Sequence, residues 1–187
     1  MTSNETITRV HAEPATPAVT GEATDWLQGL AKQRHFLRFT TRDLTDEQAG
    51  LRTTASELCL GGLIKHVTRV ERSWVTFIQH GPSAMPDFTA MTQADWAERA
   101  ATFRMLSGET LAGVLADYTK AAHDTDTVVA SLPDLDVSWP LPKAPWNEPG
   151  TSWSIRRVLI HLIAETAQHC GHADIIRESL DGAQSMA

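Results

Sequence analysis

Four segments of the 187-residue chain repeat their apolar side chains every three or four positions, which is the spacing of one buried face of an α-helix. These segments cover about residues 22–43, 56–78, 108–132 and 153–180. No segment alternates β-branched or aromatic residues with polar ones, as a half-buried strand does. A helix with one apolar face must bury it against another element, so the sequence predicts an all-α fold, a four-helix bundle.

The connections between these segments differ in length. Thr45 and Gln48 form a capping-box pattern that opens only a short turn. Residues 80–107 contain a single short helical pattern, TQADWAERA, which predicts a long crossover connection or lid between the second and third helices. The stretch Ser138–Gly150 holds four prolines and is predicted to be a loop throughout, because proline ends both helices and sheet ladders.

The length of the chain predicts one domain. We expect a flexible N-terminal arm over residues 1–21, the bundle over 22–182 and a short tail over 183–187. The arm lacks the apolar run of a signal peptide, and the chain has no apolar run long enough for a transmembrane helix. We therefore expect a cytoplasmic protein with no membrane association.

Composition narrows the class of partner. Hydrophobic residues make up 42% of the chain and charged residues 21%, which is typical of globular domains. The formal net charge is −7 without a Lys/Arg cluster, so nucleic acid is not expected as a partner. Cys59 and Cys170 lack CxxC spacing and are expected to be reduced thiols. These observations favour a small molecule or another protein as the partner.

The last helical segment carries four ionisable side chains on its apolar face. His161, Glu165, His169 and His172 follow one another at spacings of four, four and three, so they lie within about 40° of Glu165 around the helix. Burying them without partners would cost several kcal/mol, on the order of 2–7 per polar group. A divalent metal held by Glu165 and His169 would compensate this cost. A simple hydrogen-bonded or solvent-facing pair is the alternative.

A third ligand for such a metal must come from another helix. The candidate is His66, which lies inside the apolar run GGLIKHVTRVERSW of the second segment. A lone histidine in that position is also typical of a hydrogen-bonded core residue. Glu71 follows five positions later and therefore lies about 140° around the helix, which argues against it as a ligand.

Two stretches, LCLGGLIKHVTRVERSW and SWSIRRVLIHLIAETAQHCGHAD, resemble the DinB/YfiT-like superfamily of four-helix metalloproteins. They are most similar to the branch that contains mycothiol-dependent maleylpyruvate isomerase and the mycothiol S-transferases. The resemblance covers residues 22–182. It implies a metal, usually zinc, bound by His66, Glu165 and His169. Glutamate at 165, where distant thiol transferases have histidine, favours the mycothiol-linked branch.

The same resemblance implies a reaction. Zinc deprotonates a coordinated thiol, so mycothiol would serve as the thiol cosubstrate for transfer to a small electrophile, or for reversible addition that permits cis–trans isomerisation. Nitrogen and oxygen ligands also permit Ni²⁺, Fe²⁺ or Mn²⁺. The alternatives are a thiol-independent metallohydrolase or isomerase, and a non-enzymatic metal-binding, stress-associated bundle. Relatives that dimerise suggest a homodimer.

Other side chains have more than one interpretation. His172 is predicted to be a proton carrier in catalysis or an outer-shell partner of the metal site. His161 could compete as a ligand, orient Glu165 or hydrogen-bond within the core. Cys170 lies about 140° from the stripe, so it is not expected to be the nucleophile.

Two groups of residues near the Pro-rich loop also have two interpretations each. Arg156 and Arg157 form either a solvated edge or an anion clamp at the start of the last helix. Trp139, Trp146 and Trp153 either fasten this loop to the core or form the rim of a substrate site.

Overall fold

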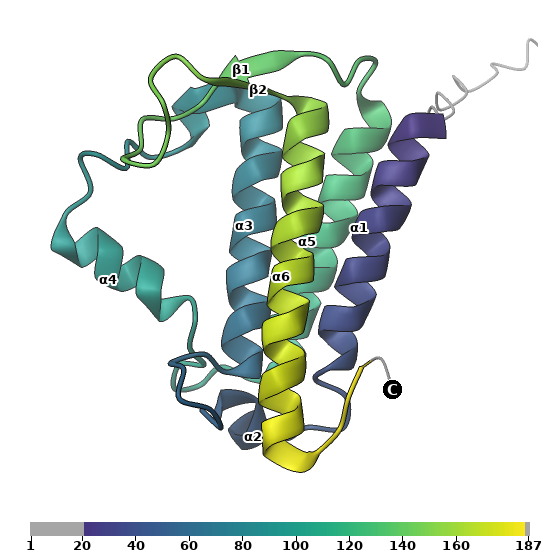
Figure 1. The fold of residues 1–187 in the computed structure, drawn as a ribbon, viewed down its shortest axis with the longest axis vertical. Helices are drawn as coiled ribbons and strands as arrows, with labels where there is room; N and C mark the ends of the chain where they lie inside the picture. Colours follow the sequence, from purple (N-terminus) through teal and green to yellow (C-terminus); the bar gives the residue numbers. More distant parts are fainter. Residues whose placement is uncertain (1–20, 186–187) are drawn as a thin grey trace, which may run out of the picture.

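The computed structural model describes residues 21–185, and four long helices that run side by side form its body (Figure 1). These are α1 (Gly21–Phe39), α3 (Leu60–His80), α5 (Leu111–Ser131) and α6 (Ile155–Asp181). The predicted all-α bundle is confirmed. Of the predicted arm, residues 1–20 lie outside the described part and Gly21 is the first residue of α1; of the predicted tail, residues 186 and 187 lie outside it.

Shorter elements connect the long helices. The predicted capping box of Thr45 and Gln48 opens α2 (Asp46–Gly50). The long crossover holds a 3-10 helix, η1 (Gly81–Ala84), and α4 (Gln93–Ala101), which lies beside the bundle (Figure 1). A two-stranded antiparallel sheet of β1 (Ser138–Pro140) and β2 (Ser152–Ser154) precedes α6.

This sheet corrects the prediction that residues 138–150 form a loop throughout. Trp139 pairs with Trp153, and Pro140 ends β1 opposite Ser152. Proline is tolerated there because a strand of a two-stranded sheet has a free edge, where a missing N–H leaves no ladder bond unmade.

Three predicted helix ends also differ from the structure. The first helix ends at Phe39, before residue 43, and the second begins at Leu60, after residue 56. The third begins at Leu111 because Thr110, not Ser107, is its N-cap and accepts a hydrogen bond from the N–H of Gly113.

The core has an apolar cluster toward each end of the bundle and a polar layer between them. One cluster includes Leu30, Phe77 and Leu159, and the other includes Leu63 and Ala173 among its members. Along each long helix a charged residue of this layer lies between the buried residues of the two clusters: Arg34 on α1, Glu71 on α3, Asp126 on α5 and Glu165 on α6. Charged side chains at the middle of the bundle must therefore pair with one another.

One such pairing joins three helices. The guanidinium of Arg34 on α1 pairs with the carboxylate of Glu71 on α3, and its Nη1 donates to Asp126 Oδ1 on α5 at 2.8 Å. Arg34 and Glu71 are each only 2% exposed. Glu71 is thus a structural partner of α1, in agreement with the prediction that it is not a metal ligand.

The end of the crossover packs directly on the start of α3. A Cβ atom at Gly62 would lie 1.9 Å from the carbonyl oxygen of Phe103, so only glycine permits this contact. Lys65 donates to the carbonyl oxygen of Arg104 at 2.8 Å, and the thiol of Cys59 donates to the carbonyl oxygen of Phe103 at 3.7 Å. The crossover is therefore held at a fixed position along α3.

We expect Gly62→Ala to destabilise the fold by about 1–3 kcal/mol, because the added methyl group must push away the backbone of Phe103. Urea denaturation monitored by circular dichroism measures this change. Gly171→Ala on α6 is the matched control: nothing lies within 4 Å of its added Cβ, and it should stabilise the helix by about 0.8–1.0 kcal/mol. Equal effects of the two substitutions would contradict the close contact.

Glu71→Gln should lower the free energy of unfolding by about 3–5 kcal/mol, because it leaves the buried Arg34 without its main counter-charge. The measurement is again the denaturation midpoint and slope. Asp124→Asn, which breaks the solvent-exposed pair of Asp124 with Lys120, should leave the midpoint unchanged. An unaltered midpoint for Glu71→Gln would show that the buried pair does not stabilise the bundle.

Candidate metal centre and pocket

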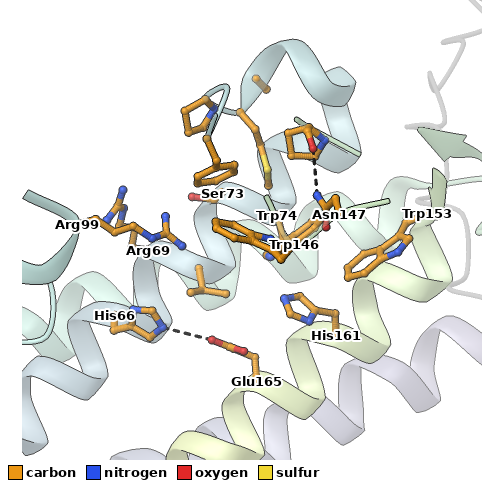
Figure 2. Close-up of a pocket in the computed structure, with 16 residues that line it drawn as sticks. His66, Arg69, Ser73, Trp74, Arg99, Trp146, Asn147, Trp153, His161 and Glu165 are labelled. Atoms are coloured by element: carbon orange, nitrogen blue, oxygen red, sulfur yellow. Dashed lines mark hydrogen bonds and ion pairs between the residues drawn. The ribbon is translucent and has the colours of Figure 1, made fainter. Parts of the chain in front are cut away.

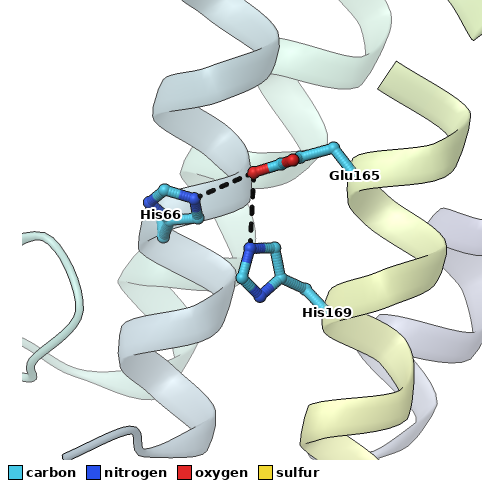
Figure 3. Close-up of side chains that lie close together, drawn as sticks. All are labelled: His66, Glu165 and His169. Atoms are coloured by element: carbon cyan, nitrogen blue, oxygen red, sulfur yellow. Dashed lines mark hydrogen bonds and ion pairs between the residues drawn. The ribbon is translucent and has the colours of Figure 1, made fainter. Parts of the chain in front are cut away.

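Three predicted ligands converge between α3 and α6 (Figure 3). Nε2 of His66 lies 3.3 Å from Oε1 of Glu165, and Nε2 of His169 lies 3.4 Å from the same oxygen. The three ligand atoms all lie within 4.8 Å of one another. Two imidazoles from different helices therefore point at a single carboxylate oxygen.

The local sequence explains this convergence. Glu165 and His169 are one turn apart on α6, so their side chains lie on the same face. His66 lies in the buried part of α3 between Ile64 and Val67. Both histidines are 8% exposed, whereas Glu165 is less buried. Packing on both helices thus fixes the imidazoles and leaves the carboxylate reachable.

The surroundings set the charge of these groups. Hydrogen bonds from His169 and His66 hold the pKa of Glu165 well below its usual range. Burial lowers the pKa of His66, against the opposing effect of Glu165. An ionised carboxylate and a neutral imidazole are the forms in which these side chains bind a metal.

Two of the three donor separations fit a divalent metal, and the two imidazole nitrogens lie within 4.8 Å of each other. In a tetrahedral zinc site, bonds of about 2.0–2.2 Å separate neighbouring nitrogen and oxygen donors by about 3.4 Å. The two separations from Glu165 Oε1 are 3.3 and 3.4 Å. Together His66, Glu165 and His169 could hold one ion through two nitrogens and one oxygen.

Two neighbouring side chains fix the imidazoles from outside the group of three potential ligands, one by ring stacking and one by a hydrogen bond. Phe103 of the crossover stacks on His66 with ring centroids 3.9 Å apart and planes 19° apart. Nδ1 of His172 lies 3.3 Å from Nδ1 of His169. With a metal bound in place of the hydrogen bond to Glu165, a proton on Nδ1 of His169, shared with His172, would leave Nε2 the free lone pair that a ligand needs.

A pocket of about 500 Å³ opens over this group (Figure 2). His66 and Glu165 line its base, whereas His169 and His172 are not among its lining residues. Its walls come from α3, the crossover, the Pro-rich loop and α6. The sequence did not show which connection faces the metal group. Both residues 80–107 and residues 138–150 contribute to this pocket.

The tryptophans divide between the two predicted roles. Trp139 fastens the loop, because its Nε1 donates to the carbonyl oxygen of Ile78 at 3.1 Å. Trp146 and Trp153 line the pocket, and Trp146 is 60% exposed at its rim. Trp153 stacks on Trp74 with ring centroids 5.0 Å apart.

His161 lies in the pocket one turn before Glu165. Its ring meets the faces or edges of Trp74 and Trp153 at centroid distances of 5.0 and 5.3 Å. Burial lowers its pKa and so favours the neutral ring. His161 does not belong to the group of three potential ligands.

Several pocket residues had not been singled out from the sequence. Arg69 and Arg99 lie together at one side of the pocket, and Ser73 and Asn147 also line it (Figure 2). Arg69 could have been found as the residue one turn after His66. Arg99 and Asn147 carry no such signal, because they come from connections whose path the sequence does not define.

Neither cysteine lines the pocket, as the sequence predicted for Cys170. The Sγ of Cys170 donates to the carbonyl oxygen of Gln33 at 3.2 Å, and burial raises the pKa of the thiol to about 12. Cys59 is buried at the start of α3. Neither thiol forms a disulfide.

Arg156 is a bundle residue rather than an anion clamp. Its guanidinium pairs with Glu22 on α1 and with Asp136 before β1, so its charge is already compensated. The guanidinium of Arg157 lies over the ring of Trp153, 4.3 Å from its centroid.

Comparison with known proteins agrees with the resemblance seen in the sequence. A search of curated proteins finds no match. Among the described helices, none has the length and apolar character needed to cross a membrane. The family model described as mycothiol-S-transferase matches residues 26–182, which include all four long helices except the first turn of α1. The chain therefore belongs to the mycothiol S-transferase family, a DinB-like family.

Proposed function

We propose that this chain is a metal-dependent transferase that joins mycothiol, through its sulfur, to a small electrophile. His66, Glu165 and His169 would hold the divalent ion, which we assign as zinc; their nitrogen and oxygen donors also suit Ni²⁺, Fe²⁺ or Mn²⁺. The observation that best supports this proposal is that two of these three residues form the base of a pocket, in a chain that belongs to the mycothiol S-transferase family.

A zinc ion in this position would lower the pKa of a thiol that reaches it, and so supply a nucleophile at neutral pH. The protein itself would position the ligands and keep water away from the reacting thiol. His66 and His169 are held by Phe103 and His172, so their rings do not need to reorient when substrate arrives. The tryptophans of the wall remove water from the base of the pocket.

In the transfer, the thiol loses its proton, sulfur forms a bond to the electrophilic carbon, and the leaving group departs with its bonding pair. Of the two neutral imidazoles that line the pocket, His66 is a proposed ligand, so we assign His161 as acceptor of the thiol proton. His172 contacts His169 on the side away from the pocket, which supports the predicted outer-shell role over the proton-carrier role.

The cytoplasmic location and the homodimer stay predictions.

Metal binding is tested by elemental analysis of protein purified without chelators. We expect about one zinc per chain and, for His169→Ala, a zinc Kd raised by about a hundredfold or more, since one of three protein ligands is lost. His123→Ala on the exposed face of α5 is the control and should keep full metal content. A wild-type chain without stoichiometric metal would instead favour the non-enzymatic bundle.

The thiol reaction is tested with mycothiol and monobromobimane. The metal-loaded protein should consume mycothiol at least about tenfold faster than His169→Ala, because the variant lacks a ligand of the centre that activates the thiol. Thermal shift gives a second readout: mycothiol should raise the melting temperature only when metal is present. Equal rates for the two proteins, with no metal-dependent shift, would exclude the transferase and leave the thiol-independent hydrolase or isomerase.

A further inference from the structure

Two arginines from different elements lie on one side of the pocket. Arg69 belongs to α3, one turn after His66, and Arg99 belongs to α4 in the crossover. Both line the pocket and both are partly buried. Figure 2 shows the two guanidiniums beside each other above His66, across the pocket from Trp153 and His161.

These two guanidiniums lack the acidic partners that the fully buried arginines of the bundle, Arg34 and Arg177, have. Within residues 21–185, neither has a carboxylate within 4.0 Å, and neither donates a hydrogen bond. The guanidinium carbon of Arg99 lies over the ring of Phe88, 5.2 Å from its centroid. Arg34 and Arg177, by contrast, are each paired with an acidic side chain.

The one carboxylate among the described residues that line the pocket, Glu165, compensates Arg69 and Arg99 only in part. Its Oε1 already faces His66 and His169. Burial, and then the positive charge of Arg69, lower the pKa of Arg99, against a smaller opposing effect of Glu165. The two arginines therefore repel each other in a partly desolvated place, which an anion would relieve.

The shape of the guanidinium favours an anion with paired oxygens. A planar guanidinium binds a carboxylate or a phosphate through two parallel hydrogen bonds, and two guanidiniums on one side of a cavity can share the oxygens of one such group. Of the two, we take the carboxylate, the smaller and singly charged group. A carboxylate held there would leave the rest of a small molecule extending over His66 and Glu165. The aromatic wall opposite remains open to the other substrate.

We propose that Arg69 and Arg99 form a carboxylate site and that the natural electrophile is a small organic acid. This inference rests on the proposed function. Mycothiol cannot supply the carboxylate, because its cysteine is acetylated on nitrogen and joined through its carboxyl group to a sugar. The anion therefore belongs to the electrophile, whose reactive carbon lies between its carboxylate and the base of the pocket.

Iodoacetate and iodoacetamide test the proposal because they differ only in a carboxylate against a neutral amide. In each reaction mycothiol sulfur bonds to the methylene carbon and iodide leaves, with release of one proton. Relative to the uncatalysed rates, kcat/KM for iodoacetate should exceed that for iodoacetamide by about tenfold or more. The double variant Arg69→Gln/Arg99→Gln should bring this ratio close to one.

Arg72→Gln is the matched control. Arg72 is on the same helix, but it is exposed, pairs with Asp117 and does not line this pocket. Its removal changes the net charge by the same amount as one of the two substitutions. The ratio of the two electrophiles should stay at the wild-type value.

A binding measurement separates this proposal from the thiol chemistry. Isothermal titration of the metal-loaded protein with phenylacetate and phenylacetamide requires no mycothiol and no turnover. Phenylacetate should bind about tenfold tighter, and the preference should weaken as salt is raised and vanish in the double variant. A folded double variant is verified by its unchanged circular dichroism spectrum.

The outcomes are distinct. Preferred binding of phenylacetate without any mycothiol consumption would support the carboxylate site and overturn the transferase. Turnover of both electrophiles with no charge preference would support the transferase and overturn the carboxylate site. A preference for the carboxylate that persists in the double variant would place the anion elsewhere, and would also overturn the assignment of Arg69 and Arg99.

Discussion

The structure depends on how the bundle accommodates charge at its middle. Apolar clusters close both ends, so a fully buried charge between them is costly unless a side chain from another helix compensates it. Arg34, Glu71 and Asp126 join α1, α3 and α5, and Glu165 joins α6 to α3 through His66. These pairings require a specific axial position of each helix, because a shift by one turn of about 5.4 Å would separate the partners.

Helix α3 contributes to both halves of this arrangement. Glu71 faces α1 and α5, while His66, five residues earlier, faces α6 and the pocket. The buried ion pair on one side of α3 therefore fixes the rotation of the helix that presents His66 on the other. Stability and the candidate metal centre share this one helix, so a change that rotates α3 affects both.

The sequence predicted those features that depend on the angular period of a helix. The face shared by Glu165 and His169, the exclusion of Glu71 and the position of Cys170 all follow from 100° per residue. The pairing of His66 with that face needed the family resemblance, since periodicity does not say which helices are neighbours. Phe103 and Arg99 could not be predicted, because the path of the crossover depends on the close contact of its backbone with Gly62. The strand Ser138–Pro140 was not predicted, because the four prolines of residues 138–150 were interpreted as a loop. Proline is compatible with the free edge of a two-stranded sheet.

The residues that line the pocket come partly from the long helices and partly from the two connections, and this bears on how a substrate would be selected. His66 and Glu165 come from long helices whose positions are fixed by core packing, whereas Arg99, Phe88 and Trp146 come from the crossover and the Pro-rich loop. Helix α4 has no buried residue, so its side chains can change with little effect on the core. Residues that would activate the thiol are thus physically separate from most of those that would select the electrophile. Arg69 is the exception: it lies on α3 one turn from His66, so it ties the anion-binding side of the pocket to the rigid part of the fold. A carboxylate bound between Arg69 and Arg99 would connect α4 to the bundle by charge, in a place where apolar packing does not.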